Sequence, residues 1–105
     1  MLFMVVERFK NRDAKAVYSR YDEKGRMTPD GLRYVGSWIE TNFDRCFQVM
    51  ECDDSSLFQQ WIDHWKDLMD FEIIQVVTSA EASVAALGKK SMQSVDSSSN
   101  IRRAD

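Results

Sequence analysis

Residues 2–9 read Leu-Phe-Met-Val-Val-Glu-Arg-Phe, and apolar side chains occupy both odd and even positions of this run. Successive residues of a β-strand point to opposite faces of a sheet, so residues 2–9 predict a strand that is buried on both sides. The two faces are Leu2, Met4 and Val6 on one side and Phe3, Val5, Glu7 and Phe9 on the other. A sheet made of such strands requires a cover on each face.

The remainder of the chain alternates between helical and strand-like periodicity, with proline, glycine and polar residues at the turns. In chain order we expect a strand at 2–9, a helix at 14–24, strands at 32–41 and 46–52, a helix at 55–68 and a strand at 71–77. Thr78 and Glu81 form a T-x-x-E capping box for a short helix that runs to Leu87 and ends at Gly88.

This order of elements predicts the fold class. Right-handed crossovers place the strands in the order 4-1-3-2, with both helices on one face of the sheet. We therefore expect an α+β fold of the ferredoxin-like βαββαβ type, with a four-stranded antiparallel sheet and a short C-terminal helix. Residues 1–88 are expected to form one domain, and residues 89–105, rich in serine, lysine and arginine, a flexible polar tail.

The sheet face without helices is predicted to be apolar, so it requires a partner. A domain of this size buries only about two-thirds of the surface of its unfolded chain, so association would also add stability. The simplest cover is a second copy of the same chain. We therefore expect a homodimer that forms through the open sheet face.

Charge and composition disfavour several classes of function. The net charge of −3 argues against a broad binding surface for nucleic acids or anionic membranes, so we expect neither as a partner. The apolar start of the chain has no basic region and is followed at once by Glu7 and Arg8, unlike a signal peptide or a membrane span. A cytoplasmic protein is the resulting expectation.

The two cysteines, Cys46 and Cys52, have neither the spacing of metal ligands nor that of a CxxC motif. Along a straight strand they would lie roughly 20 Å apart, which is too far for a disulfide. We interpret them as buried free thiols, with a redox or nucleophilic role as the alternative. The sequence leads us to expect no cofactor and no metal.

One face of each strand accepts a polar residue among apolar ones, and that face carries the candidate site. The polar residues are Glu7, Gln48 and Gln75, on the first, third and fourth strands. A polar group costs less beside a cavity or a seam than against helices, so we expect this face to be the open one. The faces expected beneath the helices are then Leu2, Met4 and Val6, Phe47 and Val49, and Ile74 and Val76.

With the first strand between the third and the fourth, Glu7, Gln48 and Gln75 are expected side by side across the sheet. The edge and wall of this candidate pocket would come from Tyr34, Trp38 and Met50. A desolvated Glu7 would have a raised pKa and would suit the role of general base. Two interpretations stay open: a small-molecule pocket, and a set of hydrogen bonds across the dimer seam.

His64 is the only histidine, and it lies at the edge of the helical stripe formed by Trp61, Trp65 and Leu68. The simpler interpretation is a solvated or capping histidine; the alternative is an acid or base at a pocket edge, or a haem ligand. Trp61 and Trp65 are interpreted as core residues. Glu7 and His64 are thus the two candidate catalytic residues.

Several segments of the chain resemble a known family. They are Glu7-Arg8-Phe9, Gly31 to Val35, Ser37-Trp38, Arg45 to Glu51, and Trp61 to Ser79. These segments are similar to a short, uncharacterised family catalogued as a domain of unknown function, and the resemblance covers roughly residues 1–85. The chain also resembles the dimeric α+β barrel superfamily, in which two ferredoxin-like sheets face each other and enclose a lumen. The resemblance implies a barrel dimer and supplies no activity.

Two classes of function fit these features. The first is a non-catalytic homodimeric module that binds a small molecule or another partner, because the sequence contains no specific catalytic motif. The alternative is a cofactor-independent oxygenase- or isomerase-like enzyme for a small apolar or aromatic substrate in the barrel lumen. In that alternative Glu7 or His64 moves a proton, and Tyr34 and Trp38 stack on the substrate.

Overall fold

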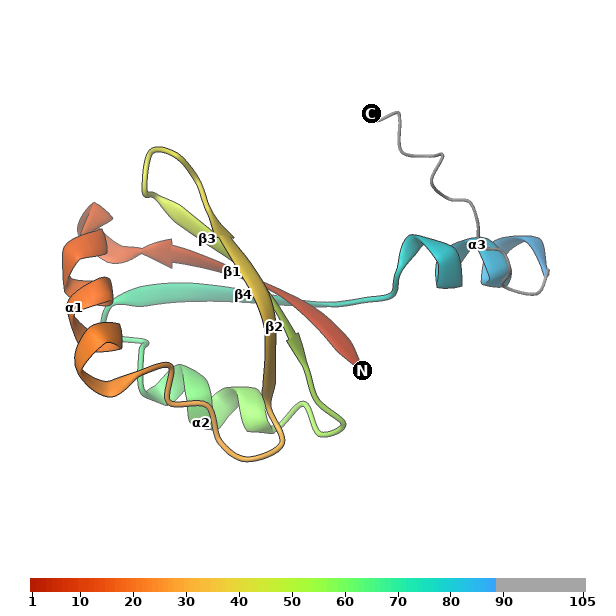
Figure 1. Ribbon diagram of the computed structural model, residues 1–105, viewed down its shortest axis with the longest axis horizontal. Helices are drawn as coiled ribbons and strands as arrows, with labels where there is room; N and C mark the ends of the chain where they lie inside the picture. Colours follow the sequence, from red (N-terminus) through yellow and green to blue (C-terminus); the bar gives the residue numbers. More distant parts are fainter. Residues whose placement is uncertain (89–105) are drawn as a thin grey trace.

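Residues 1–88 are the part of the chain that this computed structural model describes, and they form an α+β fold (Figure 1). In chain order the elements are β1 (Leu2–Phe9), the 3-10 helix η1 (Lys10–Arg12), α1 (Ala14–Lys24), β2 (Arg33–Ile39), β3 (Arg45–Glu51), α2 (Leu57–Asp63), β4 (Met69–Val76) and α3 (Ser79–Leu87). The predicted tail at 89–105 lies outside the described residues.

Within residues 1–88 the four strands form one antiparallel sheet in the order β2-β3-β1-β4. This is the predicted order counted from the other edge, and α1 and α2 lie on the same side of the sheet (Figure 1). The predicted ferredoxin-like fold is therefore confirmed. β1 is central because it pairs with β3 along one edge and with β4 along the other.

The ends of the helices follow local sequence signals. The side chain of Asp13 accepts a hydrogen bond of 3.1 Å from the backbone N–H of Ala16, and Gly25 ends α1 with a φ of 73°. α2 is shorter than predicted, because regular helix ends at Asp63. Turns continue the chain beyond it, and the backbone N–H of Trp65 still bonds to the carbonyl of Ile62 at 2.8 Å.

The core lies between the sheet and the two helices. Its buried residues include Phe3, Val5, Phe9 and Met50 from the sheet and Val17, Phe58, Trp61 and Trp65 from the helical side. Phe3 and Phe58 meet edge to face, with ring centroids 5.0 Å apart. Trp61 and Trp65 are core residues, as predicted.

The structure reverses the predicted assignment of the two sheet faces. The helices cover the face of Phe3, Val5, Glu7, Phe9, Cys46, Gln48 and Met50. The opposite face, called the open face below, carries Leu2, Met4, Val6, Trp38, Phe47, Val49, Ile74 and Val76. Alternation divides each strand into two sets, but both sets are apolar here. The twist of the sheet and the hand of its crossovers then decide which set the helices cover.

A register shift in β2 separates two residues that we expected on one face. The shift lies between Tyr34 and Gly36, so that Tyr34 pairs with Met50 while Trp38 pairs with Phe47. Tyr34 therefore lies on the helix-covered side and Trp38 on the open face. A bulge of this kind adds one residue to a strand and cannot be read from alternation alone.

The predicted capping box of the last helix is confirmed. Thr78 and Glu81 bond reciprocally at the start of α3, and Gly88 ends it in the left-handed conformation. α3 buries none of its side chains against the described residues, and it projects from the end of β4 away from the sheet (Figure 1). No helix among residues 1–88 has the length and apolar character needed to cross a membrane.

Phe43, in the turn between β2 and β3, gives a test of the backbone geometry. Its φ is 63°, and its side chain is 58% exposed. The left-handed conformation costs a residue with a Cβ atom about 1 kcal/mol relative to glycine. We expect Phe43→Gly to have a free energy of unfolding about 1 kcal/mol higher than Phe43→Ala, measured by urea denaturation. Both variants lose the ring, so equal stabilities would contradict this account.

Candidate functional site

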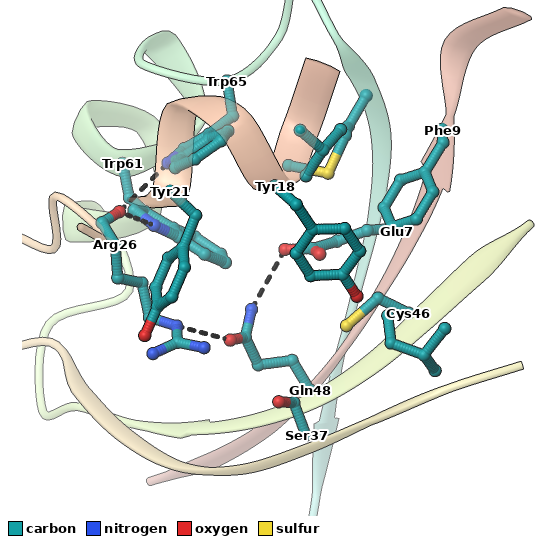
Figure 2. A pocket seen from close by; sticks show the side chains of 13 residues that line it. Glu7, Phe9, Tyr18, Tyr21, Arg26, Ser37, Cys46, Gln48, Trp61 and Trp65 are labelled. Carbon is teal, nitrogen blue, oxygen red and sulfur yellow. Dashed lines mark hydrogen bonds between the residues drawn. The ribbon is translucent and has the colours of Figure 1, made fainter. Parts of the chain in front are cut away.

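A cavity of about 150 Å³ lies between the helix-covered face of the sheet and the helices. Its polar lining consists of Glu7, Arg26, Ser37, Cys46 and Gln48, and its aromatic lining of Phe9, Tyr18, Tyr21, Trp61 and Trp65. Val17, Ile39 and Met69 complete it. In Figure 2, Tyr18 and Tyr21 lie on either side of an open space, with Gln48 below them. The cavity thus combines aromatic walls with a buried carboxyl group.

Three polar side chains form a continuous chain of hydrogen bonds along this cavity. The Nε of Arg26 donates to Oε1 of Gln48 at 2.8 Å, and Nε2 of Gln48 donates to Oε2 of Glu7 at 3.0 Å (Figure 2). Glu7 and Gln48 are only 5% and 3% exposed. A guanidinium can only donate, so Arg26 turns the NH2 end of the Gln48 amide toward Glu7.

Arg26 itself is held from several directions. Its backbone carbonyl accepts hydrogen bonds from Nε1 of Trp61 and Nε1 of Trp65, each at 3.0 Å (Figure 2). The carbon of its guanidinium lies 3.7 Å from the ring centroid of Tyr34 and 5.1 Å from that of Tyr21. These stacking contacts are favourable cation–π interactions and fix the direction of the side chain.

Burial controls the protonation of Glu7. It raises the pKa of this carboxyl group from 4.5 to about 7, since a charged group is poorly solvated there. Hydrogen bonding from the Cys46 thiol, the positive charge of Arg26 and hydrogen bonding from Gln48 each lower the pKa by less. Near neutral pH the carboxyl group is therefore close to half ionised, which suits a group that accepts or releases a proton.

The cysteines do not have the properties of nucleophiles. Burial, together with the smaller effect of the negative charge of Glu7, raises the pKa of Cys46 to about 12. The thiolate is the reactive form, so Cys46 is poorly suited to attack a substrate. Cys46 and Cys52 are both buried and free, which confirms that prediction. Burial also raises the pKa of Tyr18, with a smaller contribution from the charges of Cys46 and Glu7.

The structure brings together only some of the predicted site residues. Glu7 and Gln48 are in direct contact, but they lie beneath the helices and face neither a barrel lumen nor a dimer seam. Tyr34 reaches the site through Arg26, and its hydroxyl group shares a hydrogen bond of 2.7 Å with that of Ser37.

Three other predicted pocket residues lie apart from the cavity. Met50 is fully buried in the core and does not line it. Trp38 is 63% exposed on the open face, for the reason of register given above. Gln75 is exposed near the far end of β4, since the residue of β4 that pairs with Glu7 is Phe71.

His64 also lies outside the cavity. It is exposed at the C-terminal end of α2. Its backbone carbonyl accepts a hydrogen bond of 2.9 Å from Nη1 of Arg20, and its backbone N–H donates to the carbonyl of Trp61 at 3.1 Å. Within residues 1–88 no group of three or more histidine, cysteine, aspartate or glutamate side chains is placed to hold a metal ion.

Sequence reasoning missed several residues of the site. Tyr18 and Tyr21 belong to the apolar stripe of α1. Their hydroxyl groups could have indicated from the sequence that this edge of the core is in contact with water. Ser37 follows from the register of β2 once the bulge is known. Arg26 has no such signal, because it lies in an irregular connection between α1 and β2.

The chain matches one family model and resembles solved structures. The model described as Domain of unknown function (DUF3303) matches residues 1–90, so the predicted resemblance to such a family is confirmed. No curated protein matches the chain. A crystal structure of a dimeric ferredoxin-like protein from an uncultured marine organism is 18% identical, with a TM-score of 0.48 over 74% of this chain and 93% of that chain. An X-ray structure of an Agrobacterium tumefaciens protein is 12% identical, with a TM-score of 0.46 over 75% of this chain and 96% of that one.

Replacing Glu7 by its uncharged isostere tests the pKa of this site. Between pH 4.5 and about 7 the folded protein holds a proton on Glu7 that the unfolded chain releases. The free energy of unfolding should therefore fall as pH rises through this window, and it should fall more in the wild type than in Glu7→Gln.

Across this pH window, the difference in free energy of unfolding between the wild type and Glu7→Gln should change by up to about 3 kcal/mol, because one pKa unit corresponds to about 1.4 kcal/mol. Urea denaturation at a series of pH values measures it, and all other titrating groups are shared by the two proteins. A difference that does not vary with pH would show that the pKa of Glu7 is not raised.

Proposed function

We propose that this chain, which belongs to the family described as Domain of unknown function (DUF3303), binds a small molecule of about the size of one aromatic ring. The observation that carries the proposal is the buried carboxyl group of Glu7 in a cavity of about 150 Å³ with aromatic walls. Small-molecule sites are concave and mostly apolar, and a few polar groups orient the ligand. In another protein a cavity of about this volume accommodates benzene.

The exposure of the aromatic residues supports entry past α1. Tyr18 and Tyr21 lie one turn apart on this helix, and both are 43% exposed. Trp61 and Trp65, which line the same cavity, are only 1% and 3% exposed. A ligand that entered between the tyrosines would therefore meet a rigid aromatic wall held by the two indole hydrogen bonds to Arg26.

We also propose that the protein is a homodimer, with two open faces packed against each other as in an α+β barrel. The open face is apolar in its middle, and the uncovered face of an antiparallel sheet is normally polar, so an apolar one needs a cover. Its margins carry both arginines and acidic residues: Arg8, Arg33, Arg45, Glu40, Glu51, Asp70 and Glu72. Two copies of such a mixed margin can face each other without net repulsion, despite the negative charge of the whole chain.

An enzyme is the second candidate, and the pKa of about 7 for Glu7 favours it. A carboxyl group of this kind can remove a proton from a bound substrate near neutral pH, which is the first step of cofactor-independent isomerase or oxygenase chemistry. The fate of the ligand separates the two candidates. Native mass spectrometry identifies a compound that the purified protein retains. A binding protein should release this compound unchanged, whereas an enzyme should convert it to a product.

Filling the cavity tests the binding function. Val17 lines the cavity and is 7% exposed, so Val17→Phe should place a ring in the space of the ligand and abolish binding of phenol. Val35→Phe makes the same change at a position that is 58% exposed and should bind phenol like the wild type. Isothermal titration calorimetry measures both.

Ser37→Leu fills the cavity from the β2 side and serves as a second variant, because overpacking by Val17→Phe costs about 1–3 kcal/mol of stability. Unchanged phenol binding in folded Val17→Phe and Ser37→Leu would place any binding outside this cavity.

A charge on the open face tests the homodimer. Trp38 is 63% exposed in the single chain, so Trp38→Glu should leave the folded domain intact and dissociate the dimer at micromolar concentration. Ser19→Glu adds the same charge on the exposed surface of α1 and should remain dimeric. Light scattering after gel filtration gives the mass of each. A monomeric wild type, or a dimeric Trp38→Glu, would contradict the proposal.

A further inference from the structure

We infer that the ligand is a neutral, ring-sized molecule that donates a hydrogen bond, from a hydroxyl or a ring N–H group, to the carboxyl group of Glu7. This inference rests on the proposed binding function and adds the chemical class of the ligand. It follows from three properties of the cavity: the acceptor capacity left on Glu7, the positive charge already present at Arg26, and the size and aromatic character of the walls.

The carboxyl group of Glu7 has acceptor capacity to spare. An ionised carboxylate offers about four acceptor positions. Among the described residues it receives one amide N–H from Gln48, at 3.0 Å, and the thiol of Cys46, which is a weak donor. The other end of the Gln48 amide is taken by Arg26, at 2.8 Å. A further strong donor at Glu7 would therefore come from whatever occupies the cavity.

Among residues 1–88, the hydroxyl groups of the cavity wall do not donate a hydrogen bond to Glu7, so the ligand can supply one. The hydroxyl of Ser37 shares a hydrogen bond with that of Tyr34 at 2.7 Å. Tyr18 and Tyr21 also line the cavity, but among the described residues the hydrogen bond drawn in Figure 2 to the Glu7 carboxyl comes from Gln48, and neither tyrosine hydroxyl donates to it. A buried carboxylate without a full set of donors is costly, so a ligand that supplies one gains affinity at this point.

A cationic ligand fits the cavity poorly. The guanidinium of Arg26 already supplies a positive charge to the cavity wall, and it stacks on Tyr21 and Tyr34 at 5.1 and 3.7 Å. A second cation would be attracted by ionised Glu7, but it would be repelled by Arg26 and would find these two rings already engaged in cation–π contacts. An anionic ligand would be repelled by ionised Glu7, whose burial leaves little water to screen the charge.

The remaining volume and walls favour a single neutral ring. The cavity of about 150 Å³ is bounded by rings from the sheet and both helices, including Phe9, Tyr18 and Trp61. Such walls pack against the faces and edges of another ring. With the donor directed at Glu7, the apolar part of the ligand lies against the tryptophans.

The test uses four probes of one ring each: phenol, benzene, benzylamine as its cation, and benzoate. The titrations are made about one pH unit above the pKa of Glu7, where the carboxyl group is mostly ionised. We expect phenol to bind about tenfold more tightly than benzene, which corresponds to one added hydrogen bond to a charged acceptor, and the two charged probes to bind more weakly than benzene. Titrations followed by the indole N–H signals of Trp61 and Trp65 in NMR spectra report binding within the cavity.

Variants of Glu7 complete the test. In Glu7→Gln the preference for phenol over benzene should shrink to about two- or threefold, as for an uncharged acceptor, and in Glu7→Leu it should disappear. Glu23→Gln makes the same change on the exposed side of α1 and should keep the wild-type preference. If Glu7→Leu does not fold, Glu7→Gln alone decides.

Each other outcome overturns the inference in a recognisable way. Equal binding of benzene and phenol would show that the cavity binds rings without recognising a hydrogen-bond donor. The inference would then fail, and the proposed binding function would stand. Tightest binding of benzylamine would assign the site to a cation. Tightest binding of benzoate would assign it to an anion held by Arg26. If no probe binds, the proposed function fails together with the inference.

Discussion

One arginine in an irregular connection ties both helices to the sheet. The backbone carbonyl of Arg26 accepts two indole N–H groups from the α2 region, while its guanidinium reaches Tyr21 on α1, Tyr34 on β2 and Gln48 on β3. Hydrogen bonds in such a network support one another in a buried, low-dielectric environment. The cavity therefore keeps its shape because the contacts that fix the fold are also the contacts that line the site.

Glu7 shows what this arrangement costs. A carboxyl group held away from water destabilises its charged form by a few kcal/mol, in a protein class whose total stability is only about 5–15 kcal/mol. A leucine at this position of β1 would pack without that penalty. Charged groups with shifted pKa values gather at functional sites more often than chance would give, and the placement of Glu7 at a cavity, rather than in solid core, agrees with that tendency.

The sequence was sufficient for the fold but only partly for the site. Periodicity and turn chemistry located every strand, the capping box of α3 and the strand order, because these depend on local pattern and on the fixed hand of crossovers. It could not decide which apolar face of β1 the helices cover, since both faces have similar character. The sequence also could not predict the bulge between Tyr34 and Gly36 or the contact of Arg26 with Gln48, because both depend on contacts between residues distant along the chain.

The central position of β1 has a consequence for how the chain folds. β1 is made before both of its neighbours, β3 and β4, and the pairing with β4 joins residues as distant as Leu2 and Val76. The core can close only after β4 has left the ribosome, so the apolar first strand waits through the synthesis of nearly the whole domain. Sheets that depend on such distant pairing fold slowly and expose strand edges meanwhile. Chaperone contact during synthesis would act on this interval.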